Sequence, residues 1–334
     1  MGCQTVSRAN DACIAERLDD SDAKGSCLYV PAGSERRALR RRVASGAVVQ
    51  PQPGMFVCAA RWRQLGVVDR HLHRMRGYLQ LRPDAVFCAF SAAAAYGLEV
   101  PFGALESLHL LCSRSRGEAD SAFVRRYGFK TDGVCDVSGL RLVSVDEAVL
   151  ECCCLSSFDV GLAIVDSALR AGLFDLEALA RYFSVHGKRR KGISCAREVL
   201  RFADGASENG GESVVRGRIL MAGFTRPELQ VEIPDPIRSG TKYRVDYLWR
   251  PASGQLVAGE LDGKAKYTDR GMTRGASVLD VAMAERQRES RLTALGIKVV
   301  RFAYGQTRDQ AYLCRLLDAY GVPRADPKDM PRLK

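Results

Sequence analysis

Three charged side chains alternate along one apolar stretch of the sequence. Glu260, Asp262 and Lys264 occupy every second position of the segment that begins at Leu256. Side chains on a β-strand alternate between its two faces, so a strand here would place all three on one face. Burying such charges among apolar neighbours costs several kcal/mol per ion unless partners or a metal compensate. The spacing is therefore typical of a catalytic or metal-binding strand.

A second strand-like run supplies another carboxylate. Asp246 lies within the apolar run 243–249, which a turn separates from the first stretch. Clusters made only of carboxylate oxygens suit Mg²⁺ or Mn²⁺ better than they suit zinc. We therefore expect Asp246, Glu260 and Asp262 to bind one of these cations. Lys264 is the candidate to orient or deprotonate an attacking water.

The same stretch also has a purely structural interpretation. Asp262-Gly263 is an ordinary turn dipeptide, and Glu260 and Lys264 would then flank the solvent-facing end of a strand. The sequence of this segment alone does not distinguish the two interpretations.

The neighbouring segments favour the site. Upstream, the sequence predicts a helix that begins near Gly211, carries Glu212 on its first turn and ends at Gly223. Downstream, it predicts a charged helix that ends at Gly296 and a strand over residues 298–304. An acidic helix would thus precede the two acidic strands.

This order of helix, strands, helix and strand resembles the PD-(D/E)XK restriction-endonuclease superfamily, and its very-short-patch-repair (Vsr)-like branch in particular. The resemblance covers about residues 207–305 and implies a restriction-endonuclease-like mixed sheet flanked by helices. It implies a Mg²⁺- or Mn²⁺-dependent DNA endonuclease or nickase. The positions that match the family are Glu212, Asp246, Glu260, Asp262 and the helix-strand pair 285–302.

Two registers of the family motif stay open. Aligning Glu260 with the motif's acid places Asp262 where the family has its lysine, whereas aligning Asp262 with the acid restores the lysine as Lys264. In the first register, Lys264 or Lys266 would have to replace the catalytic base. Loss of the lysine would also fit a nuclease fold that has lost catalysis.

A second concentration of charge lies near the amino terminus. The sequence predicts a helix over residues 35–45, ended by Gly46, and then a hairpin of residues 47–50 and 55–58. A basic helix that leads into a hairpin is typical of the second half of a winged helix. The candidates for contacts with DNA are Arg36, Arg37, Arg40, Arg41 and Arg42. The structural alternative is a solvated basic face.

The order of elements over residues 36–205 resembles that of actinobacterial proteins with an abortive-infection (AbiEi-like) antitoxin amino-terminal domain. In these proteins a Vsr-like domain frequently follows. The resemblance implies a DNA-binding head and a role in toxin–antitoxin or phage-defence systems. It also provides the rival hypothesis, a non-catalytic regulator or antitoxin with a degenerate nuclease fold. Whether a toxin partner or a second copy of the chain also binds stays open.

Composition favours nucleic acid as a partner. The 334 residues include 50 Lys and Arg against 39 Asp and Glu, a net charge of +11. The basic residues of the charged helix, Arg286, Arg288 and Arg291, are candidates for phosphate contacts, with helix-surface ion pairs as the alternative. No apolar run approaches the roughly 18 residues needed to span a bilayer, and residues 1–10 lack a signal peptide's apolar core. We expect a cytoplasmic protein.

These pieces predict an α/β (α+β) multidomain protein. The expected parts are an unassigned segment 1–27, a winged-helix-like head 28–83, a middle α/β region 84–185, a basic linker 186–206, the nuclease-like domain 207–320 and a flexible tail 321–334.

Overall fold

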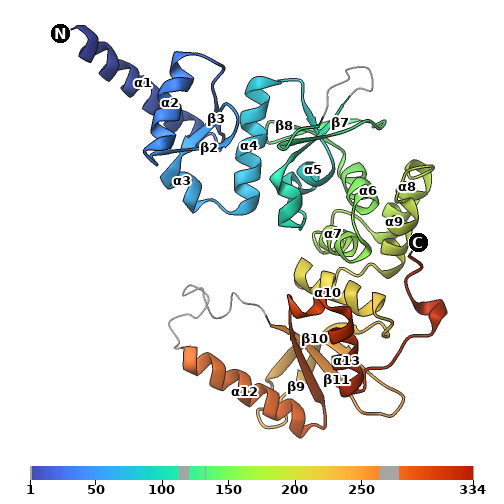
Figure 1. Cartoon of the computed structure of the whole chain (residues 1–334). Coiled ribbons are helices and arrows are strands. Elements are labelled where there is room, and N and C mark those ends of the chain that lie inside the picture. The colour runs from blue at the N-terminus through green and yellow to red at the C-terminus, as the bar shows by residue number, and fades with distance from the viewer. Residues whose placement is uncertain (1, 113–119, 132, 263–277, 334) are drawn as a thin grey trace. The chain divides into compact units, whose positions relative to one another are not determined.

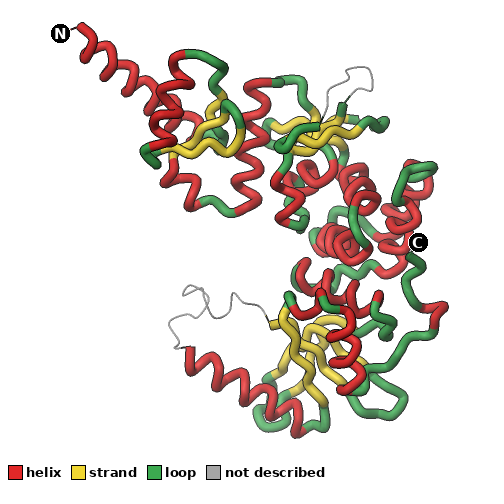
Figure 2. The backbone as a smooth tube through the Cα atoms, viewed as in Figure 1, coloured by secondary structure: helices red, strands yellow, loops and turns green. Residues whose placement is uncertain are grey.

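The described residues form helices and strands in both halves of the chain (Figures 1 and 2). A computed structural model describes residues 2–112, 120–131, 133–262 and 278–333. These residues form 12 helices and three sheets of 3, 5 and 4 strands, so the expected α/β multidomain class is confirmed. The chain divides into two units, Met1–Cys152 and Cys153–Lys334.

The first sheet follows a long amino-terminal helix. Helix α1 (Gly2–Ala23) leads to β1 (Leu28–Tyr29), α2 (Ser34–Ala44) and a hairpin of β2 (Val48–Gln52) and β3 (Met55–Cys58). The strand order is β1-β3-β2, and both pairings are antiparallel. The basic helix and the hairpin expected from the sequence are therefore confirmed.

Apolar side chains from these elements meet in one small core. Leu39 of α2 and Phe56 of β3 pack together with Ile14 and Leu18 of α1. The segment 1–27 could not be assigned from the sequence, and its helix α1 contributes to this core.

A five-stranded sheet occupies the rest of the first unit. Its strands are β4 (Val86–Phe87), β5 (Leu108–Leu111), β6 (Val124–Tyr127), β7 (Val134–Val137) and β8 (Leu140–Val143), in the order β6-β5-β4-β8-β7. Its helices are α3 (Ala59–Gln64), α4 (Val67–Leu81), α5 (Ala89–Ala95), the 3₁₀ turn η1 (Phe102–Glu106) and α6 (Val145–Leu155). Strands β4 and β8 pair in parallel, as do β5 and β6, so the sheet is mixed.

Four helices open the second unit, and one of them lies where we expected a linker. They are α7 (Phe158–Arg170), α8 (Leu176–His186), α9 (Ile193–Phe202) and α10 (Gly210–Met221). Helix α9 buries Ala196, Val199 and Leu200, an apolar face with helical spacing. Residues 186–206 are therefore not a plain linker. The expected middle region 84–185 is also divided, because its last helices belong to the second unit.

Helix α10 is held against α7 by close packing and by a buried ion pair. A Cβ at Gly217 would lie only 2.6 Å from Cα of Asp159, so no larger residue allows this approach. Arg216 Nη2 donates to Asp166 Oδ2 at 2.6 Å, and both side chains are fully buried. Arg216 Nη1 also donates to the carbonyl of Phe202 at 2.7 Å, which adds the end of α9 to the same contact.

The third sheet contains the strands that carry the candidate site. They are β9 (Glu228–Pro234), β10 (Lys242–Trp249), β11 (Val257–Asp262) and β12 (Lys298–Ala303), in the order β12-β11-β10-β9. Strands β11 and β12 are parallel, and the other pairs are antiparallel. Helix α12 (Val278–Ala294) precedes β12, and η2 (Gln306–Arg308), α13 (Gln310–Tyr320) and η3 (Pro327–Asp329) follow it. The order of helix, two strands, helix and strand expected from the sequence corresponds to α10, β10, β11, α12 and β12, whereas β9 and α13 were not part of that prediction.

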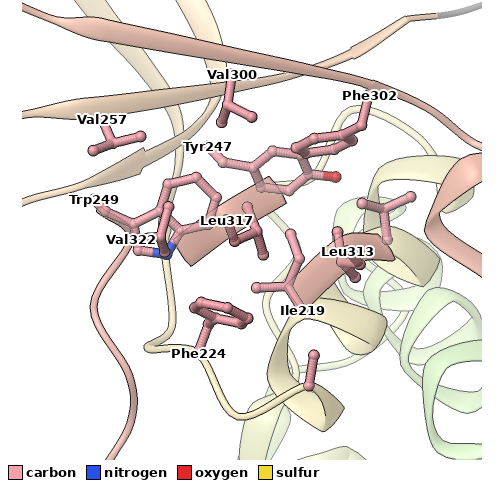
Figure 3. Packing of buried hydrophobic residues seen from close by; sticks show 12 residues of the cluster. Ile219, Phe224, Tyr247, Trp249, Val257, Val300, Phe302, Leu313, Leu317 and Val322 are labelled. Atoms are coloured by element: carbon pink, nitrogen blue, oxygen red, sulfur yellow. The ribbon is translucent and has the colours of Figure 1, made fainter. Parts of the chain in front are cut away.

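Helices cover both faces of this sheet. On one face, Ile219 of α10 and Leu317 of α13 pack on the aromatic rings of Tyr247, Trp249 and Phe302 (Figure 3). The other face packs against α12. There, the buried Leu292 contacts a cluster of sheet residues that contains Val245, Leu248 and Ala258. The even-numbered positions of β11 therefore face α12.

The segment after α13 is packed rather than a flexible tail. The backbone N–H of Thr225 donates to the carbonyl of Pro323, and that of Ala325 donates to the carbonyl of Gly223, each at 2.9 Å. The guanidinium of Arg324 lies 3.9 Å from the centre of the Phe224 ring. These contacts fix the segment beside the end of α10, and they correct the assignment of 321–334.

Within the described residues, no helix combines the length and the apolar character needed to cross a bilayer.

The buried ion pair provides a stability test. Replacing Arg216 by Met leaves the Asp166 carboxylate buried without its counter-ion, so we expect a loss of about 3–5 kcal/mol in the free energy of unfolding. Urea unfolding of the full chain measures it. The control is Arg250→Met, because Arg250 pairs with Glu228 at 2.7 Å with both side chains about half exposed; its loss should stay below about 1 kcal/mol. Equal losses in the two variants would contradict the role of the buried pair.

Candidate functional site

Asp246 lies where the pairing of β10 with β11 stops. The ladder includes Tyr247 opposite Gly259. At the next position, Asp246 Oδ2 accepts a hydrogen bond from the backbone N–H of Leu261 at 2.8 Å. A side-chain carboxylate thus takes the place of a backbone carbonyl. This contact places Asp246 beside the backbone of Glu260 and Leu261, as the spacing of the two strands suggested.

Glu260 is buried and ion-paired. It is 6% exposed, and one of its carboxylate oxygens, Oε2, accepts from Nη2 of Arg288 on α12. Arg288 is held in place by a second hydrogen bond, from Nη1 to the carbonyl of Arg244 at 3.1 Å. The other oxygen, Glu260 Oε1, is buried and has no hydrogen-bond partner among the described residues. A buried acceptor without a donor is costly, so this oxygen requires an explanation.

Asp262 lies at the end of β11 and also pairs with an arginine. Arg301 on β12 directs Nε to Asp262 Oδ1 at 3.1 Å. The same guanidinium donates through Nη1 to Glu285 of α12 at 2.7 Å, and Arg288 Nη2 lies 3.1 Å from that Glu285 oxygen. Two arginines and three carboxylates therefore form one ion network. Arg301 and Glu285 were not among the residues selected from the sequence, because only the parallel register of β11 with β12 brings Arg301 to this edge.

Glu212 forms the third part of the site, on the first turn of α10. It is 4% exposed, and its oxygens accept from the backbone N–H of Glu208 at 2.7 Å and from Nδ2 of Asn209 at 2.7 Å. Asn209 is the N-cap of α10 and accepts in turn from the N–H of Glu212. Burial raises the pKa of Glu212 to about 7, opposed by the Glu208 hydrogen bond and reinforced by the charge of Asp246.

Gln230 connects Glu212 with Asp246. Its Nε2 donates to Glu212 Oε2 at 2.9 Å and lies 3.5 Å from Asp246 Oδ1. Sequence reasoning missed this residue, since an isolated glutamine in a strand has no distinctive pattern. The structure thus links Glu212, Gln230 and Asp246 in a row that continues to the backbone of Glu260.

Two more residues selected from the sequence are Lys264, the candidate to orient water, and Arg291, a candidate for phosphate contacts. Lys264 lies outside the described residues, and the structure says nothing about its role. Arg291, selected for phosphate contacts, donates instead to Asp235 at 2.6 Å and to the hydroxyl of Tyr243 at 2.8 Å. The Asp235 side chain is fully buried in this contact, so Arg291 holds α12 on the sheet.

The described residues contain no group of three or more His, Cys, Asp or Glu side chains arranged to hold a metal ion. Of the three expected ligands, Glu260 and Asp262 are paired with arginines, and Asp246 accepts hydrogen bonds from the N–H of Leu261 and from Gln230 Nε2. The chemistry of the donors nevertheless fits Mg²⁺, since all are oxygens and since Glu260 Oε1 is buried without a donor. A divalent cation would therefore compete with Arg288 for Glu260.

The basic helix α2 presents three arginines to solvent. Arg37, Arg40 and Arg41 are exposed, whereas Arg36 and Arg42 are half buried. None of the described acidic residues forms an ion pair with Arg37, Arg40 or Arg41. This face of α2 is therefore exposed and positively charged.

Comparison with known proteins identifies relatives but no function. No family model matches the chain. Two proteins of Mycobacterium tuberculosis are each 30% identical to it over 167 residues: uncharacterized protein MT2308 of strain CDC 1551 / Oshkosh and uncharacterized protein Rv2248 of strain ATCC 25618 / H37Rv. Each match covers 49% of this chain and 59% of the relative. The chain thus spans about three-fifths of the length of these curated relatives.

The raised pKa of Glu212 predicts a pH-dependent stability. Between its ordinary pKa of 4.5 and its folded value of about 7, Glu212 holds its proton only in the folded chain. Its stabilising contribution is therefore complete below pH 4.5 and is lost as pH rises through 7. In EDTA, the free energy of unfolding should fall more from pH 5 to pH 8 in the wild type than in Glu212→Gln. The exposed Glu232→Gln serves as the control and should follow the wild type. Parallel curves for all three proteins would contradict the shift.

Proposed function

We propose that the chain is a Mg²⁺- or Mn²⁺-dependent DNA endonuclease or nickase of the PD-(D/E)XK superfamily, of the Vsr-like kind. One observation carries this proposal. At one end of a mixed sheet with the expected order of elements, Asp246 contacts the backbone beside Glu260 and is linked through Gln230 to Glu212. Placing Glu212 and Glu260 out of water, with Asp246 half buried between them, costs free energy that a bound cation would offset.

Each carboxylate has a distinct role in this proposal. Asp246 and Glu260 would hold the cation, with Asp262 as a further ligand once it is released from Arg301. Glu212, with its pKa near 7, would hold or accept a proton at the edge of the site. A bound Mg²⁺ would stabilise charge on the scissile phosphate and lower the pKa of the attacking water. Lys264 remains the candidate to orient that water.

In this proposal, the two arginines of the ion network would bind phosphate groups of the substrate. Arg288 and Arg301 form ion pairs with Glu260 and Asp262. A guanidinium presents a planar fork of donors that matches phosphate as well as carboxylate. When cation and DNA bind, these side chains would contact phosphate oxygens in place of the carboxylates. The positive net charge and the exposed arginines of α2 support DNA as the substrate.

The rival proposal is a non-catalytic DNA-binding regulator or antitoxin of the AbiEi kind. The specific observation in its favour is that Glu260 and Asp262 are already neutralised by arginines, as expected for a nuclease fold that no longer binds metal. In that case the exposed face of α2, with Arg37, Arg40 and Arg41, would provide the function. A toxin or a second copy of the chain would then be the further partner, and either proposal describes a cytoplasmic protein.

Cleavage of DNA tests the nuclease. Purified full chain is incubated with supercoiled or single-stranded DNA in Mg²⁺, Mn²⁺ or EDTA. We expect cleavage only with a divalent cation, and Asp246→Asn should reduce its rate by about a hundredfold or more, because even outer-shell partners of a metal contribute up to about that factor. The control Asp204→Asn removes a half-buried carboxylate that pairs with Arg226 and should cleave like the wild type. Absence of cleavage in every reaction would overturn the nuclease.

Binding without cleavage tests the regulator. Neutralising Arg37, Arg40 and Arg41 together to Gln should weaken specific DNA binding strongly and reduce its salt dependence, since each lost phosphate contact lowers the number of released counter-ions. Glu260→Ala should bind like the wild type. The charge-matched control replaces Arg181, Lys188 and Arg197, three exposed basic residues of the second unit. Equal binding by the two triple variants would remove α2 from the interface.

A further inference from the structure

Gln230 has an unusual backbone conformation for its residue type. Its φ is +52°, in the left-handed region that glycine adopts without strain and that other residues adopt at a cost. In the ladder of β9 with β10, Leu229 lies opposite Tyr247 and Val231 lies opposite Val245. Gln230 therefore lies across from Asp246, at the point where the regular pairing is interrupted. This conformation directs the side chain to the carboxylates.

The contacts of the Gln230 amide determine its orientation. Nε2 has two carboxylate oxygens as neighbours, Glu212 Oε2 at 2.9 Å and Asp246 Oδ1 at 3.5 Å. Only the nitrogen of an amide can donate to carboxylates, so the reverse orientation would bring three acceptor oxygens together. Oε1, bonded to the same carbon as Nε2, is the other polar atom of this amide. It is buried and accepts no hydrogen bond from the described residues.

The site thus contains two buried oxygens that lack donors, Gln230 Oε1 on β9 and Glu260 Oε1 on β11. Asp246, on the strand between them, contacts both neighbourhoods through Gln230 Nε2 and the N–H of Leu261. Buried acceptors normally have a donor, a water or an ion as a partner. Unpartnered oxygens around one carboxylate are the donor type that a hard divalent cation takes up.

We propose that Gln230 is a further residue of the cation site: its amide nitrogen positions Glu212 and Asp246, and its carbonyl oxygen is an additional, neutral ligand for the divalent cation. The inference rests on the proposed nuclease function and extends it, since none of the positions that match the family lies on β9. A neutral ligand adds an oxygen without adding charge to a site that already contains several carboxylates. It also explains why a strained glutamine lies here.

Mn²⁺ binding by the full chain without DNA tests this inference, measured by titration calorimetry and by the electron spin resonance signal of free Mn²⁺. Gln230→Met keeps the length of the side chain and removes both polar atoms. We expect the Kd for Mn²⁺ to rise about tenfold or more, the range found for groups that orient metal ligands. Gln255→Met is the matched control, because Gln255 is an exposed glutamine that contacts the carbonyls of Leu256 and Gly296. Its Kd should equal that of the wild type.

Gln230→Gly separates the amide from the backbone. Glycine adopts a φ of +52° freely, so a purely structural role would leave Mn²⁺ binding intact in this variant. We expect instead a loss of Mn²⁺ affinity similar to that of Gln230→Met. Wild-type affinity in a folded Gln230→Gly or Gln230→Met chain overturns the role of Gln230 while the nuclease proposal stands. Failure of the wild type itself to bind Mn²⁺ and to cleave DNA overturns both.

Discussion

The fully buried ion pair of Arg216 with Asp166 is the contact on which the second unit depends. It lies one turn beyond Glu212 on α10 and attaches that helix to α7, at a point where Gly217 permits very close packing. Because both charges are removed from water, the pair tolerates little displacement. The start of α10, and Glu212 with it, is thereby fixed relative to the sheet. The helices α7 to α9 are in this sense part of the candidate site's support.

The candidate site combines buried or half-buried carboxylates with arginines that neutralise part of their charge. Glu260 is 6% exposed and would be expensive to bury alone, yet Arg288 neutralises only one of its two oxygens. The network continues through Glu285 to Arg301, and its two arginines face three carboxylates, so one negative charge is left over. Glu260 Oε1 also has no donor among the described residues. The network therefore leaves both negative charge and acceptor capacity on its carboxylate side.

The sequence predicted those features that depend on local pattern. The alternation of Glu260 and Asp262, the order of helices and strands, and the glycines that end helices are all visible in a linear chain. Gln230 was missed because a positive φ at a non-glycine residue arises from the meeting of two strands, which no local pattern records. Helix α9 was missed because the basic run before it, from Lys188, suggested a solvated linker and obscured the apolar spacing that follows. Tertiary contacts decided both cases.

The pairing of Arg288 with Glu260 has a thermodynamic consequence. The guanidinium pairs with the carboxylate that a cation would need. The free energy of binding a cation would therefore be reduced by the free energy needed to break this ion pair. An anion that draws Arg288 away makes Glu260 available, and a cation on Glu260 makes Arg288 available to an anion. Linkage requires these two effects to be equal in free energy. A cation and an anion at this end of the sheet would consequently bind with positive cooperativity, even without direct contact between them.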